Sequence, residues 1–234
     1  MRKETRAFVE AVDRAITLPE PVVEIGSFQV EGQEKYADLR SLFAGRAFIG
    51  CDMRPGKGVD RIEDLHKLTF ADASVGTVIM LDTLEHVRNC FQAMEEVRRV
   101  LKPGGVVLMT SVMLCPIHDY PCDYWRFTPQ GFEALLDGFE TRRVYSDRPK
   151  LFPRSVYALG VKGALGKDEV ARADDAARAV VSRYYGEEAL SVVTVQGNLV
   201  TFTRRKFRGR VLFALRALER ARRRFRGMFK RSSP

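Results

Sequence analysis

The hydrophobic residues of the chain fall into short continuous runs, separated by stretches in which apolar positions recur every three or four residues. The short runs have the length of buried strands, and the three-to-four-residue repeats are typical of amphipathic helices. Strands that alternate with helices predict an α/β fold, a mostly parallel, doubly wound sheet with helices on both faces. The expected strands are residues 22–25, 47–51, 75–81, 106–112, 141–145 and 155–161, and the expected helices are residues 8–16, 36–43, 87–101, 129–136 and 168–185.

Two segments near the C-terminus have patterns of their own. Residues 191–203 alternate polar and apolar positions around Gln196-Gly197-Asn198, which predicts a β-hairpin. Residues 204–231 place apolar residues at three-to-four spacing among arginines, which predicts a basic amphipathic helix. We therefore expect one α/β domain over residues 1–203 and a helical tail over residues 204–234.

The positive charge of the chain is concentrated in that tail. Of the formal net charge of +9, residues 204–234 carry +12, because they hold 13 Arg and Lys and a single acid, Glu219. The rest of the chain is close to neutral, at −3. The apolar stripe favours an anionic membrane surface as the partner of the tail over nucleic acid. A helix docked on its own domain is the alternative.

Composition and cysteine usage favour a cytoplasmic protein. Hydrophobic residues make up 45% of the chain and charged residues 29%, as in globular proteins. No apolar run approaches the roughly 18 residues that a membrane span requires, and residues 1–16 are too charged for a signal-peptide core. The four cysteines form no CxxC pair, which agrees with a reduced compartment. We expect the protein in the cytoplasm, peripherally bound to the inner membrane face through its tail.

Polar residues follow the first predicted strands. Glu24-Ile25-Gly26 ends the first strand, where an acid and a glycine turn can hold a cationic amino-acid ligand. Asp52 ends the second strand, where an acid can accept both hydroxyl groups of a ribose. In the next loop Asp64 can accept a hydrogen bond from an exocyclic amine, with Leu65 packed on a flat base. An ordinary strand-to-helix turn explains the first motif equally well, an Asp at a strand end is common, and Asp64 alone is more typical of a solvated loop acid, so no single motif decides.

Five motifs occur in order over residues 20–112, and these are Glu24-Ile25-Gly26, Asp52, Asp64-Leu65-His66-Lys67-Leu68-Thr69-Phe70, Leu84-Glu85-His86-Val87 and Leu101-Lys102-Pro103-Gly104-Gly105. Together they are more specific than any one of them. In this order they resemble the class I S-adenosylmethionine-dependent methyltransferase family. The resemblance implies a Rossmann-like sheet of seven strands, the last of them antiparallel, and S-adenosylmethionine as the cofactor.

The resemblance also implies roles for individual residues. The chain departs from the family at Phe28 and Val30, where a fuller motif has glycines, although Gly32 can supply a turn. No G-x-G-x-x-G follows the first strand, which speaks against a dinucleotide-binding fold. The implied cofactor-binding residues are Glu24, Gly26 and Ser27 at the methionine part, Asp52 at the ribose, Asp64 and Leu65 at the adenine, and Leu81 and Asp82 at the reactive side.

The densest cluster of functional side chains is residues 115–128, in the loop after the strand at 106–112, and it holds the only Trp of the chain. A loop at the carboxyl edge of the sheet would overhang the cofactor's methyl group, so we expect it to bind the methyl acceptor. His118 is the candidate general base, because an acceptor hydroxyl must lose its proton as it attacks the methyl group. A structural loop pinned by its aromatic residues is the alternative. The expected acceptor-binding residues are Asp119, Asp123, Tyr124, Trp125 and Arg126.

His86 is the second candidate base, because in the family its position begins the helix beside the pocket. A histidine that holds Glu85 or the backbone at a helix end is equally consistent with the motif. Cys115, His118 and Cys122 fit no standard zinc spacing and lack an obvious fourth ligand, so no metal is expected.

These observations predict a methyltransferase that O-methylates a small polar acceptor, such as a sugar or a glycan or natural-product precursor. The sulfonium supplies the electronic driving force, so the protein mainly positions the two reactants. One alternative is an RNA methyltransferase that uses the basic tail. It is disfavoured because the body has no basic excess and the N-methylating tetrapeptide is missing where Leu81-Asp82-Thr83-Leu84 stands. A non-catalytic adaptor on a degenerate methyltransferase fold is the other alternative, consistent with Phe28 and Val30.

Overall fold

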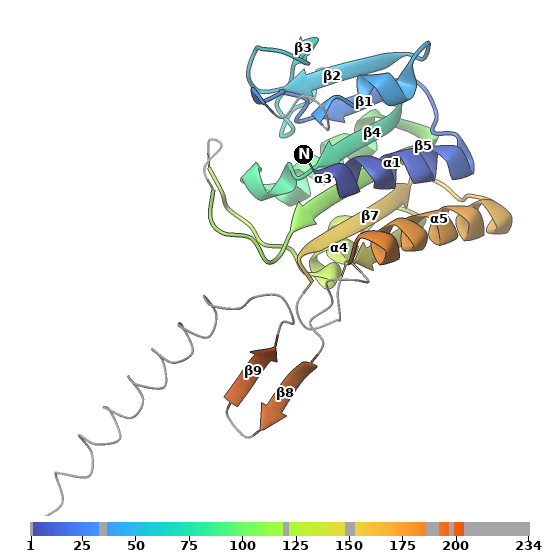
Figure 1. Cartoon of the computed structure of the whole chain (residues 1–234). Coiled ribbons are helices and arrows are strands. Elements are labelled where there is room, and N and C mark those ends of the chain that lie inside the picture. The colour runs from blue at the N-terminus through green and yellow to red at the C-terminus, as the bar shows by residue number, and fades with distance from the viewer. Residues whose placement is uncertain are drawn as a thin grey trace, which may run out of the picture. The chain divides into compact units, whose positions relative to one another are not determined.

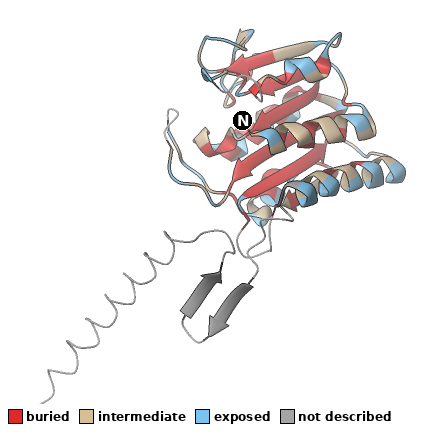
Figure 2. Ribbon diagram, in the orientation of Figure 1, coloured by how far each residue is buried: buried red, intermediate tan, exposed pale blue. Residues whose placement is uncertain are grey.

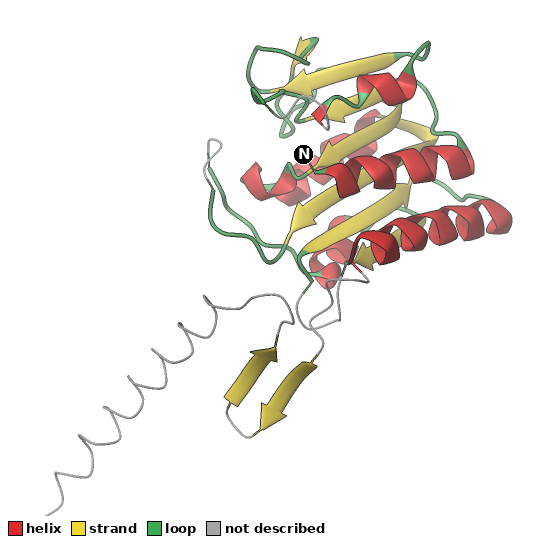
Figure 3. Ribbon diagram, in the orientation of Figure 1, coloured by secondary structure: helices red, strands yellow, loops and turns green. Residues whose placement is uncertain are grey.

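The computed structural model describes residues 2–32, 37–118, 122–147, 153–185, 192–196 and 199–203. The chain divides into two compact units, Met1–Glu187 and Glu188–Pro234. The first unit holds a seven-stranded sheet with helices on both faces (Figures 1 and 3), which confirms the predicted α/β class. In the second unit, strands β8 (Val192–Gln196) and β9 (Leu199–Thr203) pair antiparallel.

The strands of the first unit are β1 (Val22–Ile25), β2 (Phe48–Asp52), β3 (Arg61–Ile62), β4 (Val75–Leu81), β5 (Leu101–Val112), β6 (Thr141–Ser146) and β7 (Ser155–Val161). They lie in the order β3-β2-β1-β4-β5-β7-β6. Strands β1 to β5 pair in parallel, whereas β7 is antiparallel to both of its neighbours, as the resemblance implies. The strand order reverses between β1 and β4. Doubly wound sheets bind their ligands at the carboxyl ends of the strands beside such a switch point.

Two hydrophobic cores cover the sheet, one on each face (Figure 2). Successive residues of β4 alternate between them, with Val78 and Met80 in one core and Ile79 and Leu81 in the other. The first core packs against α3 (Cys90–Val100) and α4 (Pro129–Leu135), and the second against the adjacent helices α1 (Lys3–Ile16) and α5 (Lys167–Tyr185). Because helices cover both faces, β1, β4 and β7 are buried along their whole length.

The helix predicted over residues 87–101 is shorter in the structure. It begins at Cys90, because the side chain of Asn89 caps it by accepting a hydrogen bond from the backbone N–H of Gln92. This start sets the phase of the helix, so Phe91 lies outside its apolar face and is 62% exposed. At the other end Leu101 already belongs to β5, where it pairs with Val75 before an irregularity over residues 102–105.

Two other predicted helices and one short strand can be compared with the structure. The helix predicted over residues 36–43 is a 3-10 helix, η1 (Arg40–Phe43), and residues 33–36 lie outside the described residues. Helix α4 begins as predicted, with Thr128 accepting a hydrogen bond from the backbone N–H of Gly131 at 3.0 Å. Strand β3 has only two residues, too few to show an apolar run.

The C-terminal predictions are tested only in part. Strands β8 and β9 confirm the antiparallel pair of the predicted hairpin, while Gly197 and Asn198 lie outside the described residues. The tail over residues 204–234 also lies outside them, so the boundary at residue 203 stays a prediction. In the part of the chain that the structure describes, no helix has the length and apolar character that crossing a membrane requires.

Candidate active site

Glu24 is a buried acid near the carboxyl end of β1, beside the switch point. It is 3% exposed, and no hydrogen bond or ion pair holds its carboxyl group among the described residues. Burial raises the pKa of Glu24 to about 8, and repulsion from Asp38 adds to the rise. The carboxyl group is therefore protonated at neutral pH until a cation approaches it.

The turn after β1 has a shape that only glycine allows. Gly26 has a φ of +88°, and a Cβ on it would lie 2.6 Å from Oγ1 of Thr83. The backbone N–H groups of Gly26 and Ser27 both donate to the carbonyl of Cys51, at 2.8 and 3.0 Å, and so hold the turn against β2. The hydroxyl of Ser27 is buried and has no hydrogen-bond partner among the described residues. The turn thus presents a buried polar group without a partner, three residues after Glu24 in the chain.

Asp52 ends β2, the neighbour of β1. Its carboxylate accepts hydrogen bonds from the backbone N–H of Arg54 at 3.0 Å and from its Nε at 3.4 Å. The Arg54 guanidinium also lies over the ring of Phe28, 4.4 Å from its centroid. A Cβ on Gly56 would lie 2.3 Å from the same ring. Phe28 therefore packs on the loop that follows Asp52.

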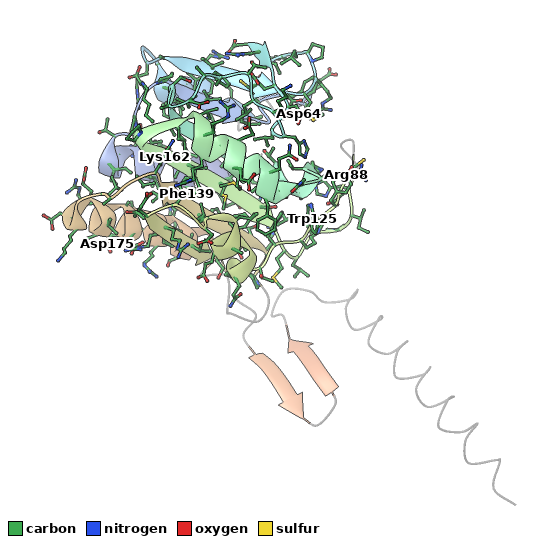
Figure 4. All side chains as sticks on the ribbon, turned by 180° about the vertical axis from the view of Figure 1, so that it is seen from behind. Asp64, Arg88, Trp125, Phe139, Lys162 and Asp175 are labelled. Atoms are coloured by element: carbon green, nitrogen blue, oxygen red, sulfur yellow. The ribbon has the colours of Figure 1, made fainter. Side chains whose placement is uncertain are left out.

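Asp64 lies after β3, with a half-exposed side chain that accepts hydrogen bonds from the backbone N–H and Nδ1 of His66, at 2.9 and 2.7 Å. Partial burial raises the pKa of Asp64, but these hydrogen bonds outweigh it and the pKa falls below its usual range. Figure 4 shows Asp64 on the same edge of the first unit as Arg88 and Trp125. Leu65 is buried in the first core, so its predicted contact with the adenine stays a prediction.

At the end of β4, Leu81 is packed in the second core and Asp82 turns the chain with a φ of +51°. The Asp82 carboxylate accepts hydrogen bonds from Nε and Nη2 of Arg2, at 3.1 and 2.8 Å, and from the Thr110 hydroxyl at 3.0 Å. Burial raises the pKa of Asp82, but the Arg2 guanidinium outweighs burial and lowers it overall. Arg2 is not recognisable from the sequence as a partner of Asp82, because no local pattern connects residue 2 to the end of β4.

Glu85 is a second buried acid, in the 3-10 helix η2 (Leu84–His86) that follows β4. It is 1% exposed, and its Oε2 accepts a hydrogen bond from the Ser111 hydroxyl at 2.6 Å. Its other oxygen, Oε1, has no hydrogen-bond partner among the described residues. Burial raises the pKa of Glu85 to about 7, and the charge of Asp82 adds to the rise. Glu85 stands within the motif Leu84-Glu85-His86-Val87, but the sequence alone predicts no role for it in binding or catalysis.

The two candidate bases lie together. The ring of His86 lies 5.0 Å from that of His118, at an interplanar angle of 89°. Nδ1 of His86 lies 2.7 Å from the carbonyl oxygen of Cys122. Nδ1 of His118 lies 3.2 Å from the carbonyl of Pro116 and 3.3 Å from Oδ2 of Asp123. The 3-10 helix η2 and the loop after β5 thus bring both imidazoles to one place.

The loop between β5 and α4 is fastened to η2. The backbone N–H groups of Tyr124 and Trp125 donate to the carbonyl of Glu85 at 2.8 and 3.3 Å. Nε1 of Trp125 donates to the carbonyl of Val87 at 2.9 Å. Nearly half of each of these two aromatic residues is exposed, and their predicted contact with an acceptor stays a prediction.

Asp123 and Arg126 hold the loop between β5 and α4 together through hydrogen bonds within the loop. Asp123 accepts hydrogen bonds from Nη2 of Arg126 at 2.6 Å and from the backbone N–H of His118 at 2.9 Å. The hydrogen bonds from Arg126 hold the pKa of Asp123 well below its usual range. Arg126 also donates to the carbonyls of Cys115 and Pro116. The predicted contact of Asp123 and Arg126 with an acceptor stays a prediction. Asp119, the other predicted acceptor-binding acid, lies outside the described residues.

A family model described as "Methyltransferase domain" matches residues 47–109. An uncharacterized methyltransferase of Mycolicibacterium gilvum is 29% identical over 169 residues, which are 66% of this chain and 63% of that protein. These matches confirm the resemblance to the class I methyltransferases. The chain spans less than two thirds of the length of this curated relative.

Two solved methyltransferase structures are similar to this chain to different degrees. The CurJ carbon methyltransferase superposes with a TM-score of 0.50 at 14% sequence identity, covering 68% of this chain and 54% of that chain. The trans-methyltransferase CalH, solved in complex with SAH, has a TM-score of 0.49 at 18% identity, covering 68% and 57%. The likeness to CurJ supports the predicted Rossmann-like methyltransferase fold.

The family supports S-adenosylmethionine as the cofactor, and the residues at the carboxyl edge fit its chemistry. A cationic amino group would stabilise the ionised form of Glu24, which burial alone disfavours. The hydroxyl of Ser27, which has no hydrogen-bond partner among the described residues, belongs to the glycine turn that follows Glu24 in the chain. Asp52 ends the next strand, as the ribose contact requires. A groove lined by Phe91 and residues of α4 and β6 contains none of the predicted site residues.

Proposed function

We propose that the chain transfers the methyl group of S-adenosylmethionine to a hydroxyl oxygen of a small polar acceptor, such as a sugar or a natural-product precursor. One observation carries the proposal: His86 and His118 lie together beside the buried Glu85, at the edge where the cofactor's methyl group would point. Transfer from a sulfonium requires mainly that donor and acceptor be held in line. A hydroxyl acceptor must in addition lose a proton, which is the task of a neighbouring base.

His118 is the residue best placed for that proton. Its Nδ1 faces the oxygens of Pro116 and Asp123, which only accept hydrogen bonds, so its Nε2 is left to accept a proton. The half-exposed rings of Tyr124 and Trp125 lie in the same loop and offer an apolar wall for a sugar or an aromatic acceptor. His86 has the same arrangement on Cys122 and is the second candidate.

We also propose that residues 204–231 hold the protein at an anionic membrane surface. The charge supports this, because the tail carries +12 while the rest of the chain carries −3. Its aromatic and aliphatic residues repeat at helical spacing, which gives arginine-rich faces beside an apolar stripe.

The proposed function is tested with His118→Ala and a panel of hydroxyl acceptors, using labelled S-adenosylmethionine. We expect turnover to fall by roughly 10²–10⁴-fold, the usual contribution of a positioned base, while the affinity for S-adenosylhomocysteine stays unchanged. Leu114→Ala changes an exposed side chain of the same loop and serves as the control, with turnover near that of the wild type.

Two outcomes would contradict the proposal. Calorimetry that shows no heat with either S-adenosylmethionine or S-adenosylhomocysteine would reject methyl transfer altogether. Unchanged turnover in His118→Ala together with loss of turnover in His86→Ala would move the role of the base to His86.

A further inference from the structure

Three side chains at the edge of β4 and β5 each offer a metal-binding atom. A carboxylate oxygen of Glu85, a ring nitrogen of His86 and a ring nitrogen of His118 all lie within 4.8 Å of one another. We propose that these three residues bind a divalent transition-metal ion of the zinc class.

The carboxylate of Glu85 is fixed by one of its oxygens, while the other has no hydrogen-bond partner among the described residues. Oε2 of Glu85 accepts a hydrogen bond from the Ser111 hydroxyl at 2.6 Å, which fixes the orientation of the group. Oε1 is buried and has no hydrogen-bond partner in the part of the chain that the structure describes. Buried carboxylate oxygens are normally paired. A metal ion bound to Oε1 explains why this oxygen is left without a hydrogen bond.

The two imidazoles are oriented as metal ligands. Nδ1 of His86 faces the Cys122 carbonyl at 2.7 Å, and a carbonyl only accepts, so Nδ1 carries the proton. Nδ1 of His118 faces the Pro116 carbonyl and Oδ2 of Asp123, which fixes the same tautomer. Each histidine therefore has its lone pair on Nε2. Metal-binding histidines generally donate their other ring N–H to a carbonyl or a carboxylate, as both do here.

Two imidazole nitrogens and one carboxylate oxygen form the ligand set of many catalytic zinc sites, which keep a fourth position open. Imidazole favours zinc and its transition-metal neighbours, whereas magnesium and calcium prefer oxygen ligands. The metal-ligating cluster found among the described residues contains no cysteine. Cys122 contributes only its backbone carbonyl to His86, and the Cys115 carbonyl accepts from Arg126.

The open position gives the ion a function, and this step rests on the proposed methyl transfer. A hydroxyl oxygen of the acceptor would occupy that position and lose its proton to solvent more readily, because a bound cation lowers the pKa of the hydroxyl. With the ion present, Nε2 of His118 binds the ion. The ion, in place of His118, then activates the hydroxyl group of the acceptor. The ion would also join η2 to the loop after β5.

The test is metal binding by the full chain after removal of metals with a chelator. Isothermal titration with Zn²⁺ is expected to show a 1:1 site, and Co²⁺ is expected to give the intense visible bands of a four-coordinate site. Glu85→Gln and His118→Ala should each weaken Zn²⁺ binding by more than tenfold, since even residues outside the ligand shell contribute 10–100-fold. Melting curves show whether the variants are folded, and His86→Gln provides a second ligand variant.

The free cysteines require a matched control, because thiolates also bind zinc. The double variant Cys115→Ser, Cys122→Ser keeps the backbone carbonyl that faces His86, and it should bind Zn²⁺ as the wild type does. Absence of a 1:1 site would overturn the proposal, as would binding that survives in folded Glu85→Gln but is lost in the cysteine variant. Titration with S-adenosylhomocysteine separates the two proposals, because a protein that binds this ligand but no Zn²⁺ keeps the proposed function and loses only the metal site.

Discussion

The buried carboxyl group of Glu24 should make the stability of the ligand-free protein depend on pH. Burial raises the pKa of Glu24 from 4.5 to about 8 in the folded state, with repulsion from Asp38 adding to the rise. Between these two values the folded state binds one proton more than the unfolded state. The free energy of unfolding therefore falls as the pH rises, by about 1.4 kcal/mol for each pH unit. The loss begins near pH 5 and levels off above about pH 8.

Glu24→Gln removes this titration and preserves the size of the side chain. From pH 6 to pH 8 the wild type should lose roughly 2–3 kcal/mol of stability relative to the variant. Urea unfolding followed by circular dichroism at pH 6, 7 and 8 measures the difference. Glu31→Gln removes a charge from an exposed position of the same loop and should follow the wild type. Parallel stability curves for the wild type and Glu24→Gln would refute the argument.

The cofactor should reverse part of this effect. If the ammonium group of S-adenosylhomocysteine contacts Glu24, binding favours the ionised carboxylate and releases a proton. The stabilisation by saturating ligand should then be larger at pH 8 than at pH 6 in the wild type, and the gain should shrink in Glu24→Gln. Equal ligand stabilisation at both pH values would show that the ammonium group binds elsewhere.

Two further predictions concern the ribose site and the tail. Asp52→Ala should weaken S-adenosylhomocysteine binding by roughly 1–3 kcal/mol in isothermal titration, the scale for polar groups left unpaired, and an unchanged Kd would remove Asp52 from the site. Deletion of residues 204–234 should leave the binding of S-adenosylhomocysteine intact and abolish co-sedimentation with anionic liposomes. Basic residues contribute about 1 kcal/mol each at such surfaces, and this attraction weakens as the salt concentration rises. Equal pelleting of both proteins would reject the membrane proposal, and unfolding of the truncated protein would support a tail docked on its own domain.

The sequence predicted the fold well because most strands of the sheet are covered on both faces. A strand buried on both sides appears as a continuous apolar run, which is how β1 and β4 were found. Strand β3 was not predicted from the sequence, because its two residues are too few to form an apolar run. Phe91 was misplaced because periodicity alone does not fix the start of a helix, which here depends on the cap at Asn89.

The candidate site was predictable where it depends on strand ends and not where it depends on contacts between residues far apart in the sequence. Glu24 and Asp52 lie at the carboxyl edge because each comes near or at the end of a parallel strand. The contact of Glu85 with Ser111 joins positions 26 residues apart, and that of Arg2 with Asp82 joins positions 80 residues apart. No spacing rule connects such pairs. The one available signal was an acid, Glu85, inside a motif flanked by apolar residues.

Phe28 stands where the motif of the class I methyltransferases that the chain resembles has a glycine, and the structure shows how it is accommodated. The ring of Phe28 lies against Gly56, and a Cβ atom on Gly56 would clash with the ring. The glycine in the loop after β2 therefore makes room for Phe28. The guanidinium of Arg54 lies over the same ring, and the same residue donates to Asp52. Phe28 is thus packed into the layer that holds the expected ribose ligand. The contacts of Phe28 with Arg54 and Gly56 give this bulky residue a structural reason, so its presence alone is no argument for a degenerate, non-catalytic fold.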